Sequence, residues 1–513
     1  MKKGFVYLAG AGPGDPGLIT VKALEAIGEA DCVIYDFLAN PALVRREGLE
    51  AVYVGKQGGD HTLPQEEINA LIVKKAKEGK TVVRLKGGDP YIFGRGGEEA
   101  EELVKHGIPF AVIPGVSSFY SAPAYAGIPV THRDFADHFE VVTGHRRADA
   151  VQDGPVSRRT GRPGATDSRT DITLPSYDPH KTFVFLMGMK NLAMIARGLV
   201  TAKGFPSDTP ACVIVWGTTT RQRSAAGTLE TIAHVAEEAS IKAPAIIIIG
   251  RVVSLRDSLR WFETLPLFGK RIVVTRTREQ ASVLSRKLAR LGADVIEFPT
   301  IAIRPADDTR AIDEAITSLA DFGWTIFTSQ NAVSLFFERL AGLKLDARAF
   351  RDCRVAAIGP ATAEALEARS ITPDLVPEEY VAEALLAELE KPGVRGVRIL
   401  LPCAAEARNV LAEGLAKLGA DVTRIHIYET VVPFDLPPEL RDAARDADVV
   451  TFASSSTARN FFSIIGDTKA TLACIGPVTA DAVRKLGREP EIVASEYTID
   501  GLVEAVMDYY QKK

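Results

Sequence analysis

The stretch VYLAGAGPGD, residues 6–15, runs from an apolar strand pattern directly into a loop of glycine and proline. The same pattern recurs in TVVRLKGGDP (81–90) and in AVIPGVSS (111–118). In open α/β sheets, ligands bind outside the carboxyl ends of the strands, where glycine lets the backbone approach a ligand closely. These segments therefore predict a small-molecule site at one edge of a sheet.

Size and composition limit the class of protein. A chain of 513 residues exceeds the roughly 250–300 residues that one core supports, so two or more domains are expected. Apolar content of 46% with 25% charged residues is typical of globular proteins, and no apolar run approaches the ~20 residues that cross a bilayer. The opening MKKGFVYLAG lacks the features of an export signal, so we expect a cytoplasmic protein that does not act on a membrane.

Charge and cysteine usage exclude two further classes. The net charge of −5 argues against a nucleic-acid-binding protein, because phosphate neutralisation needs a basic face. The cysteines lie far apart, without the C-x-x-C spacing of zinc or redox sites, so we expect reduced structural thiols and no bound metal. Their positions are Cys32, Cys212, Cys353, Cys403 and Cys474.

The first half of the chain has the pattern of an α/β fold. Between residues 5 and 253, apolar runs that mostly end on glycine alternate with amphipathic segments. The first helix is expected to begin after Thr20, a plausible N-cap residue, with Leu24 and Ile27 facing the core. Residues 146–180 break the pattern with arginines among glycine, proline and serine, which predicts a mobile insert; a disordered segment and a flap that gates the substrate are the two interpretations.

The second half contains an internal repeat, which predicts two similar α/β lobes. RIVVTRTREQASVLSRKLARLGADVIEFP (271–299) matches RILLPCAAEARNVLAEGLAKLGADVTRIH (398–426). TIFTSQNAVSLFF (325–337) matches VTFASSSTARNFF (450–462), and VAAIGPATAEAL matches LACIGPVTADAV in the same order. The segment LRDSLRWFETLPLFG precedes the repeat, and we place the main domain boundary there, with residues 263–269 as the linker.

The loop after the first strand does not suit a phosphate group. Pro13 and Pro16 each remove a backbone amide donor from the turn that would have to cradle it. Asp89 adds a negative charge to the second loop. A ligand with cationic or neutral parts fits better, and a sulfonium cofactor with an adenosine and an amino-acid end meets that description.

This half resembles the uroporphyrinogen III C-methyltransferases of the tetrapyrrole methylase family over about residues 4–262. The resemblance is carried by GAGPGDPGLIT, RLKGGDPYIFGRGGEE, PGVSS, AYAGIPVTHRD, VTGH, FLMG, WGTTTRQR and IIIIGRVVSLRDSLRWF. It implies a two-subdomain methylase fold over residues 1–262, a homodimer formed through this half, and S-adenosylmethionine as methyl donor. The residues implied to bind that donor are Pro13, Gly87, Gly88, Asp89, Ile92, Ser117, Ser118, Met187, Gly217 and Ala245. The family's short acidic piece after VTGH is replaced here by the insert.

The resemblance also implies catalytic roles. Asp36, at the carboxyl end of CVIYD, would be the general base that takes a proton after methylation, and Lys56 would be a proton donor. A strand-end aspartate that only caps the next turn is the alternative. Because the substrate is rich in carboxylates, cations must face the cleft, and Arg95, His132 and Arg133 are the candidates. Solvated surface charges are the alternative for these three.

Residues 270–513 resemble uroporphyrinogen III synthase through KRIVVTR, TSQNAV, AIGPATAEAL, LLP, IYETV, FASSSTARNFF and CIGPVTADAV. The resemblance implies two α/β lobes joined by a pair of strands, lobe one from residues 270–301 plus 430–513 and lobe two from residues 302–429. Tyr428 would assist departure of the substrate hydroxyl, or else be a buried structural tyrosine. Hydroxyls at a strand end suit carboxylate groups or cap the next helix; these are Ser454, Ser455, Ser456 and Thr457.

The two resemblances together predict a bifunctional tetrapyrrole enzyme. The second half would cyclise hydroxymethylbilane to uroporphyrinogen III, and the first half would methylate that product twice to precorrin-2, a precursor for sirohaem or cobalamin. One enzyme alternative is a methylase that acts on a later corrinoid. A different class of alternative treats the C-terminal lobes as a ligand-binding or sensing module.

Overall fold

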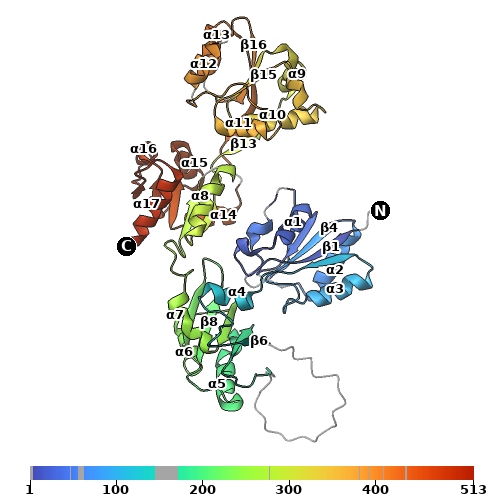
Figure 1. Ribbon diagram of the computed structural model, residues 1–513, viewed down its shortest axis with the longest axis vertical. Helices are drawn as coiled ribbons and strands as arrows, with labels where there is room; N and C mark the ends of the chain where they lie inside the picture. Colours follow the sequence, from blue (N-terminus) through green and yellow to red (C-terminus); the bar gives the residue numbers. More distant parts are fainter. Residues whose placement is uncertain are drawn as a thin grey trace. The chain divides into compact units, whose positions relative to one another are not determined.

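The structure is a computed structural model, and it describes residues 4–44, 46, 48–55, 63–144, 172–275, 278–380, 382–391, 393–407, 409–433 and 436–512. Lys56 and most of the predicted insert at 146–180 lie outside the described residues. The chain divides into two compact units, Met1–Lys270 with Ala289–Asp294, and Arg271–Leu288 with Val295–Lys513. Figure 1 shows their strands and helices along the chain.

The first unit begins with a five-stranded parallel sheet in the order β3-β2-β4-β1-β5. Its strands are β1 (Phe5–Gly10), β2 (Cys32–Tyr35), β3 (Glu50–Tyr53), β4 (Thr81–Lys86) and β5 (Phe110–Ile113). Helices α2 (Gln65–Lys77) and α3 (Gly96–Lys105) pack on one face, and α1 (Val21–Glu29) packs on the other. Burial on both faces explains why the inner strands β1, β2 and β4 are largely apolar, whereas the edge strands β3 and β5 are only partly buried.

Helix α1 begins as predicted but buries a different face. The Thr20 side chain accepts a hydrogen bond from the backbone N–H of Ala23 at 3.2 Å, so the N-cap is confirmed. Leu24, expected in the core, is 53% exposed, and the buried residues are Ala23, Ala26 and Ile27. Small alanines let the helix pack close to the sheet, and Leu24 falls on the flank of that face.

The first unit continues with a mixed sheet in the order β6-β7-β10-β8-β9. Its strands are β6 (His138–Thr143), β7 (Lys181–Leu186), β8 (Pro210–Val215), β9 (Arg223–Thr228) and β10 (Ala245–Ile249). Helices α5 (Leu192–Lys203) and α6 (Ile232–Glu238) pack on one face of this sheet. Helix α4 (Ser118–Tyr125) starts at the loop after β5 and packs on the other face, so it connects the two sheets. The short helix α7 (Arg256–Leu259) follows β10.

In the second unit, one sheet has the order β12-β11-β18-β19-β20. Its strands are β11 (Arg271–Val274), β12 (Asp294–Glu297), β18 (Val449–Phe452), β19 (Thr471–Cys474) and β20 (Ile492–Val493). The helices in these stretches of chain are α8 (Arg278–Arg290), α14 (Pro438–Arg445), α15 (Ser455–Ile465), α16 (Pro477–Lys485) and α17 (Ile499–Gln511). The core of this lobe includes the fully buried Phe298, Phe452 and Phe461.

The other sheet of the second unit has the order β13-β17-β16-β14-β15. Its strands are β13 (Ala302–Pro305), β14 (Trp324–Phe327), β15 (Arg354–Ala357), β16 (Arg398–Ala404) and β17 (Asp421–Val431). The helices between them are α9 (Arg310–Thr317), α10 (Gln330–Gly342), α11 (Pro360–Glu367), α12 (Ala382–Glu390) and α13 (Val410–Lys417). The chain enters this lobe through β13 and leaves through β17, which pair antiparallel.

The internal repeat reappears as a repeated strand order. The repeat matches β11, β12, β18 and β19 with β16, β17, β14 and β15. The order β12-β11-β18-β19 in one sheet then corresponds strand for strand to β17-β16-β14-β15 in the other. The predicted fold class, an α/β methylase fold followed by a duplicated two-lobe α/β fold, is confirmed.

Candidate functional site

The three glycine-rich loops of the first sheet meet at its carboxyl edge. Gly88 N–H donates to the carbonyl of Gly12 at 2.7 Å. A Cβ built on Gly115 would lie 2.3 Å from the carbonyl oxygen of Gly88, and one on Gly10 would lie 2.5 Å from it. Glycine is therefore required at this junction because the loops pack backbone against backbone.

Asp89 ties two of these loops together. Its Oδ2 accepts the Gly115 N–H at 2.9 Å, and its Oδ1 accepts the Tyr91 N–H at 2.7 Å. A Cβ built on Gly88 would be in ordinary van der Waals contact with Ser117 Cα at 3.9 Å and Ser118 N at 4.0 Å, so the Gly88 loop lies against the serine pair. The structure thus brings the predicted GGD loop and the predicted serine pair to one place.

The loops of the second sheet join this edge through the loop after β1. Asp15 N–H donates to Thr218 Oγ1 at 3.2 Å, and Tyr125 Oη donates to Asp15 Oδ2 at 2.7 Å. Burial and this hydrogen bond raise the pKa of Tyr125 above its usual range. A Cβ on Gly217 would lie 2.3 Å from the Cβ of Ala122 in α4. Pro13 and Gly217, which are far apart in the sequence, therefore belong to loops that are fastened together.

Three other predicted donor-binding residues follow β4 or β7 or begin β10. Met187 follows β7 and is 52% exposed, and Ile92 in the loop after β4 is 42% exposed. Ala245 is the first residue of β10 and pairs with Val215, the last residue of β8. The second sheet therefore contributes two loop residues and a strand end to the donor site that the sequence predicts.

Backbone strain collects in the same loops. Non-glycine residues with positive φ cost of order 1–3 kcal/mol each and are concentrated at functional sites. Several of those described here follow β4, β7 or β8: Phe93 (φ 53°), Arg95 (φ 60°), Met187 (φ 57°), Trp216 (φ 51°) and Thr218 (φ 69°). This strain lies in the loops that follow β4, β7 and β8, and each of these loops carries a predicted donor-binding residue.

Asp36 lies at this edge, immediately after β2. Its Oδ1 accepts the N–H groups of Leu38 at 3.2 Å and Gly87 at 3.4 Å, and its Oδ2 accepts Arg84 Nη2 at 3.3 Å. The carboxylate keeps 27% of its side-chain surface exposed. It is thus oriented by three donors and still reachable by a substrate.

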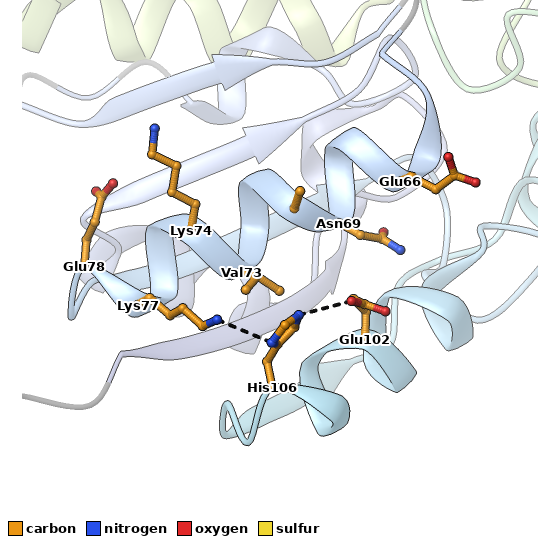
Figure 2. A pocket seen from close by; sticks show the side chains of 9 residues that line it. Glu66, Asn69, Val73, Lys74, Lys77, Glu78, Glu102 and His106 are labelled. Carbon is orange, nitrogen blue, oxygen red and sulfur yellow. Dashed lines mark hydrogen bonds and ion pairs between the residues drawn. The ribbon is translucent and has the colours of Figure 1, made fainter.

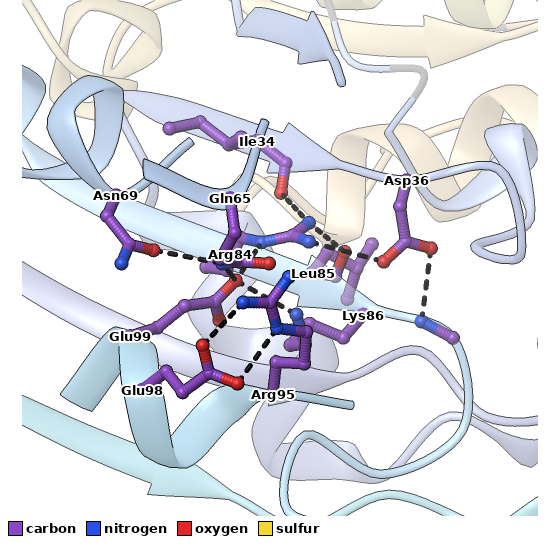
Figure 3. A network of polar contacts seen from close by, with 11 residues as sticks. Ile34, Asp36, Gln65, Asn69, Arg84, Leu85, Lys86, Arg95, Glu98 and Glu99 are labelled. Carbon is purple, nitrogen blue, oxygen red and sulfur yellow. Dashed lines mark hydrogen bonds and ion pairs between the residues drawn. The ribbon is translucent and has the colours of Figure 1, made fainter. Parts of the chain in front are cut away.

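A buried charge network beside Asp36 was not predicted from the sequence. Glu99 Oε1 accepts hydrogen bonds from Arg84 Nε at 3.0 Å, Lys86 Nζ at 2.9 Å and Gln65 Nε2 at 3.1 Å, as Figure 3 shows. Burial lowers the pKa of Lys86, and the neighbouring Arg84 adds to the effect. The sequence did contain an indication of this network. Arg84 and Lys86 lie inside the apolar strand TVVRLK, and buried cations need a negatively charged partner.

The predicted substrate cations are not gathered into one cluster. Arg95 forms an ion pair with Glu98, with Nε 2.8 Å from Oε1, and this partner raises the pKa of Arg95. His132 Nδ1 accepts the N–H of Asp134 at 3.1 Å, and Arg133 is exposed. In the described part of the chain, no contact joins Arg95 to either of the other two cations.

A cavity of about 650 Å³ lies elsewhere, between α2 and α3. Figure 2 shows the His106 ring between Lys77 and Glu102, at 3.3 Å and 3.2 Å from their charged groups. Lys77, Glu102 and His106, which line this cavity, are therefore already paired with one another. None of the predicted site residues lines this cavity, so it is not the predicted donor or substrate site.

In the second unit, Tyr428 has a partner that the sequence analysis did not identify. Tyr428 lies in β17, is 7% exposed, and has its Oη 3.0 Å from Ser329 Oγ. Ser329 is the N-cap of α10 and accepts the Ala332 N–H at 3.1 Å. The internal repeat could have indicated this partner, because it aligns Ser329 with the predicted site residue Ser454.

The hydroxyl cluster at the end of β18 forms a helix cap. Ser454 Oγ accepts the Thr457 N–H at 3.3 Å, and Thr457 Oγ1 accepts the Ser454 N–H at 3.3 Å, which completes a capping box for α15. Ser455 Oγ donates to the Val478 carbonyl, and Ser456 Oγ lies 3.0 Å from Ser454 Oγ. Capping, one of the two predicted roles, thus engages the Ser454 and Thr457 side chains.

Three general properties complete the description. All five cysteines are buried and free. Within the residues that the structure describes, no group of three or more His, Cys, Asp or Glu side chains could hold a metal ion. Over the same residues, no helix combines the length and apolar character needed to cross a membrane.

Comparison with known proteins identifies both halves of the chain. A family model described as Tetrapyrrole (Corrin/Porphyrin) Methylases matches residues 6–233, and one described as Uroporphyrinogen-III synthase HemD matches residues 282–504. The "Porphyrin biosynthesis protein HemD" of Ruminiclostridium josui is 35% identical over 518 residues, which are 99% of this chain and 98% of that protein. The chain belongs to both families, joined in one polypeptide.

A further relative and a solved structure are named as methyltransferases. The "Uroporphyrinogen-III C-methyltransferase" of Bacillus subtilis is 43% identical over 350 residues, 68% of each chain. A solved structure of the Thermus thermophilus uroporphyrin-III C-methyl transferase, complexed with S-adenyl homocysteine, is 36% identical with a TM-score of 0.38, and the match covers 49% of this chain and 100% of that one. The predicted fusion of a methyltransferase with a synthase is confirmed.

Proposed function

We propose that the second unit cyclises hydroxymethylbilane to uroporphyrinogen III and that the first unit methylates this product twice, with S-adenosylmethionine, to precorrin-2. The observation that carries the proposal is the pairing of the two family matches, residues 6–233 and 282–504, in one chain. The product of the second unit is then the substrate of the first. The reaction classes are methyl transfer to carbon and dehydrative ring closure.

The donor would lie along the carboxyl edge of the first sheet. The exposed apolar side chains of Ile92 and Met187 fit an adenosine and a thioether better than a phosphate. When bound, S-adenosylmethionine supplies an activated methyl group on a sulfonium. Asp89 and Asp36 add negative charge at this edge, which favours a cation. The proposed contacts are Pro13, Gly87, Gly88, Asp89, Ile92, Ser117, Ser118, Met187, Gly217 and Ala245.

Asp36 would take the proton that the pyrrole carbon loses after it is methylated. Three donors orient its carboxylate, and part of the side chain faces solvent, as a general base requires. Lys56 is proposed as the proton donor. Arg95, Arg133 and His132 are proposed to pair with the carboxylates of the tetrapyrrole, and Arg95 would exchange Glu98 for the substrate.

In the second unit, Tyr428 is proposed to assist departure of the hydroxyl from hydroxymethylbilane. Its Oη is held by Ser329 Oγ, which is itself fixed by the N-terminus of α10. A phenol in this position could protonate the leaving hydroxyl as a weak general acid. Ser454, Ser455, Ser456 and Thr457, at the N-terminus of α15, are proposed to bind carboxylates of the substrate.

The remaining proposals concern assembly and place. We propose a homodimer formed through the methylase half, located in the cytoplasm, that acts on soluble tetrapyrroles without a bound metal. Sedimentation of the purified chain measures the oligomeric state directly, and a dimer of the full chain is expected. If removal of residues 1–262 leaves a monomer, the methylase half forms the dimer contact. A monomer of the full chain at micromolar concentration would contradict the proposed dimer.

The function is tested by separating the two activities. Asp36→Ala is expected to lower methyl transfer by about 100-fold or more and to leave ring closure unchanged, whereas Tyr428→Phe should slow ring closure by about tenfold or more and spare methyl transfer. Products are identified by chromatography and mass spectrometry. Parallel loss of both activities in either variant would contradict two separate sites. Methylation of a later corrinoid but not of uroporphyrinogen III would favour the alternative reaction.

A further inference from the structure

The charge network at Glu99 is buried, and its hydrogen bonds are unevenly shared between the two carboxylate oxygens. The side chains of Arg84, Lys86 and Glu99 are 3%, 5% and 0% exposed. Three donors share Glu99 Oε1, while Oε2 is buried with no hydrogen-bond partner among the described residues. Burying two cations and a carboxylate costs several kcal/mol per ion, so packing alone does not account for the cluster.

The network leaves one nitrogen of Arg84, Nη2, for Asp36. Nε of Arg84 is bound to Glu99, and Nη1 donates to the carbonyls of Leu85 at 3.1 Å and Ile34 at 3.3 Å. Nη2 donates to Asp36 Oδ2 at 3.3 Å. A guanidinium held on its other nitrogens has a fixed plane, so its last donor has a fixed direction. Figure 3 shows this arrangement from Glu99 through Arg84 to Asp36.

Lys86 connects the same network to the donor loop. It is the last residue of β4, directly before Gly87, whose N–H donates to Asp36 Oδ1 at 3.4 Å. Glu99 therefore anchors both strand residues, Arg84 and Lys86, that border the Asp36 carboxylate. A shift of Lys86 would move Gly87, and with it the second donor to Asp36.

We propose that Arg84, Glu99 and Lys86 are positioning residues that fix the Asp36 carboxylate for proton removal. The inference rests on the proposed role of Asp36 as general base. Glu99 acts only through the other two residues and touches neither substrate nor methyl donor. Misplacement of a catalytic group by about 1 Å can cost 100-fold in rate, which sets the scale of the expected effect.

The test compares Glu99→Gln with Glu102→Gln in the full-length chain. Both residues lie on α3, but Glu102 pairs at the surface with Lys105 and His106. For Glu99→Gln we expect kcat of methyl transfer to fall by about tenfold or more, with KM for uroporphyrinogen III and the affinity for S-adenosylhomocysteine changed less than about threefold. Glu102→Gln should match the wild type, and ring closure should be unchanged in both.

A double-variant cycle shows whether the loss passes through Asp36. If Glu99 acts by placing that carboxylate, Asp36→Asn combined with Glu99→Gln should transfer labelled methyl groups no more slowly than Asp36→Asn alone. Multiplied losses, or a Glu99→Gln enzyme with wild-type kcat, would overturn the inference. Failure of the proposed function is separate and visible, because Asp36→Asn would then methylate at the normal rate.

A conservative variant guards against a folding defect. Arg84→Lys keeps the positive charge, but a single ammonium cannot reach both Glu99 and Asp36 as the guanidinium does. We expect the unfolding temperature of this variant to lie within a few degrees of the wild-type value. Its kcat for methyl transfer should still fall by about tenfold. Wild-type kcat in Arg84→Lys would show that charge alone suffices and would also overturn the inference.

Discussion

Gly115→Ala should break the loop junction on which donor binding depends. The new methyl group would lie 2.3 Å from the carbonyl oxygen of Gly88 and 2.7 Å from Gly10 Cα. Because ordinary contacts begin at 3.4 Å and both obstacles are backbone, the loop after β4 would have to move by about 1 Å. That movement pulls the Gly115 N–H away from Asp89, which accepts it at 2.9 Å.

The size of the effect follows from the clash. Overpacking of this kind costs about 1–3 kcal/mol, and each 1.4 kcal/mol corresponds to about tenfold in a dissociation constant. If the whole cost falls on the donor-bound state, Gly115→Ala is expected to bind S-adenosylhomocysteine about 5-fold to 100-fold more weakly. It should also unfold at lower urea concentration. Ring closure by the second unit should be unaffected.

The matched control is Gly97→Ala in α3, where a built Cβ meets nothing within 4 Å. Alanine is favoured over glycine in a helix by about 1 kcal/mol, so this variant should be as stable as the wild type or more so. Titration calorimetry measures both affinities under the same conditions. Wild-type affinity in Gly115→Ala would refute the account of the junction.

Three further outcomes are expected. Ser329→Ala should slow ring closure, though less than removal of the Tyr428 hydroxyl, and cost about 1 kcal/mol in unfolding free energy through the lost N-cap. Hydrogen bonds from Lys75 and Lys80 lower the pKa of Glu50 to about 2, so their stabilisation is present above the unfolded-state pKa near 4.5 and is lost as pH falls toward 2. Since that carboxylate is 37% exposed, Glu50→Gln should cost about 1 kcal/mol at pH 7, and the difference in urea midpoint from the wild type should shrink below pH 5. Phe336→Ala, in the core of lobe two, should cost about 3–5 kcal/mol in urea unfolding of the second unit.

The fold could be predicted because its signals are local. Apolar runs that lead into glycine mark parallel strands buried on both faces, and β1 and β4 are such strands. The repeat predicted two similar lobes, and the shared strand order bears out that symmetry. Leu24 was misplaced because helical spacing locates a face but does not say which flank of it packs on the sheet.

The site could be predicted only in part, because its polar contacts join distant residues. Glu99 gathers Gln65, Arg84 and Lys86 from two other elements, and Ser329 meets Tyr428 across 99 positions in the chain. Such pairings depend on strand order, which the motifs do not encode. The glycines were placed at the right edge, but at Gly10 and Gly115 they serve contact between loops as well as space for a ligand.

The most direct test of the account supplies the purified full-length chain with hydroxymethylbilane, with and without S-adenosylmethionine, and identifies the tetrapyrroles formed. We expect uroporphyrinogen III, with its last ring inverted, when the donor is absent, and its dimethylated product precorrin-2 when the donor is present. Recovery of a macrocycle without the inverted ring, or of unmethylated uroporphyrinogen III in the presence of donor, would contradict the account.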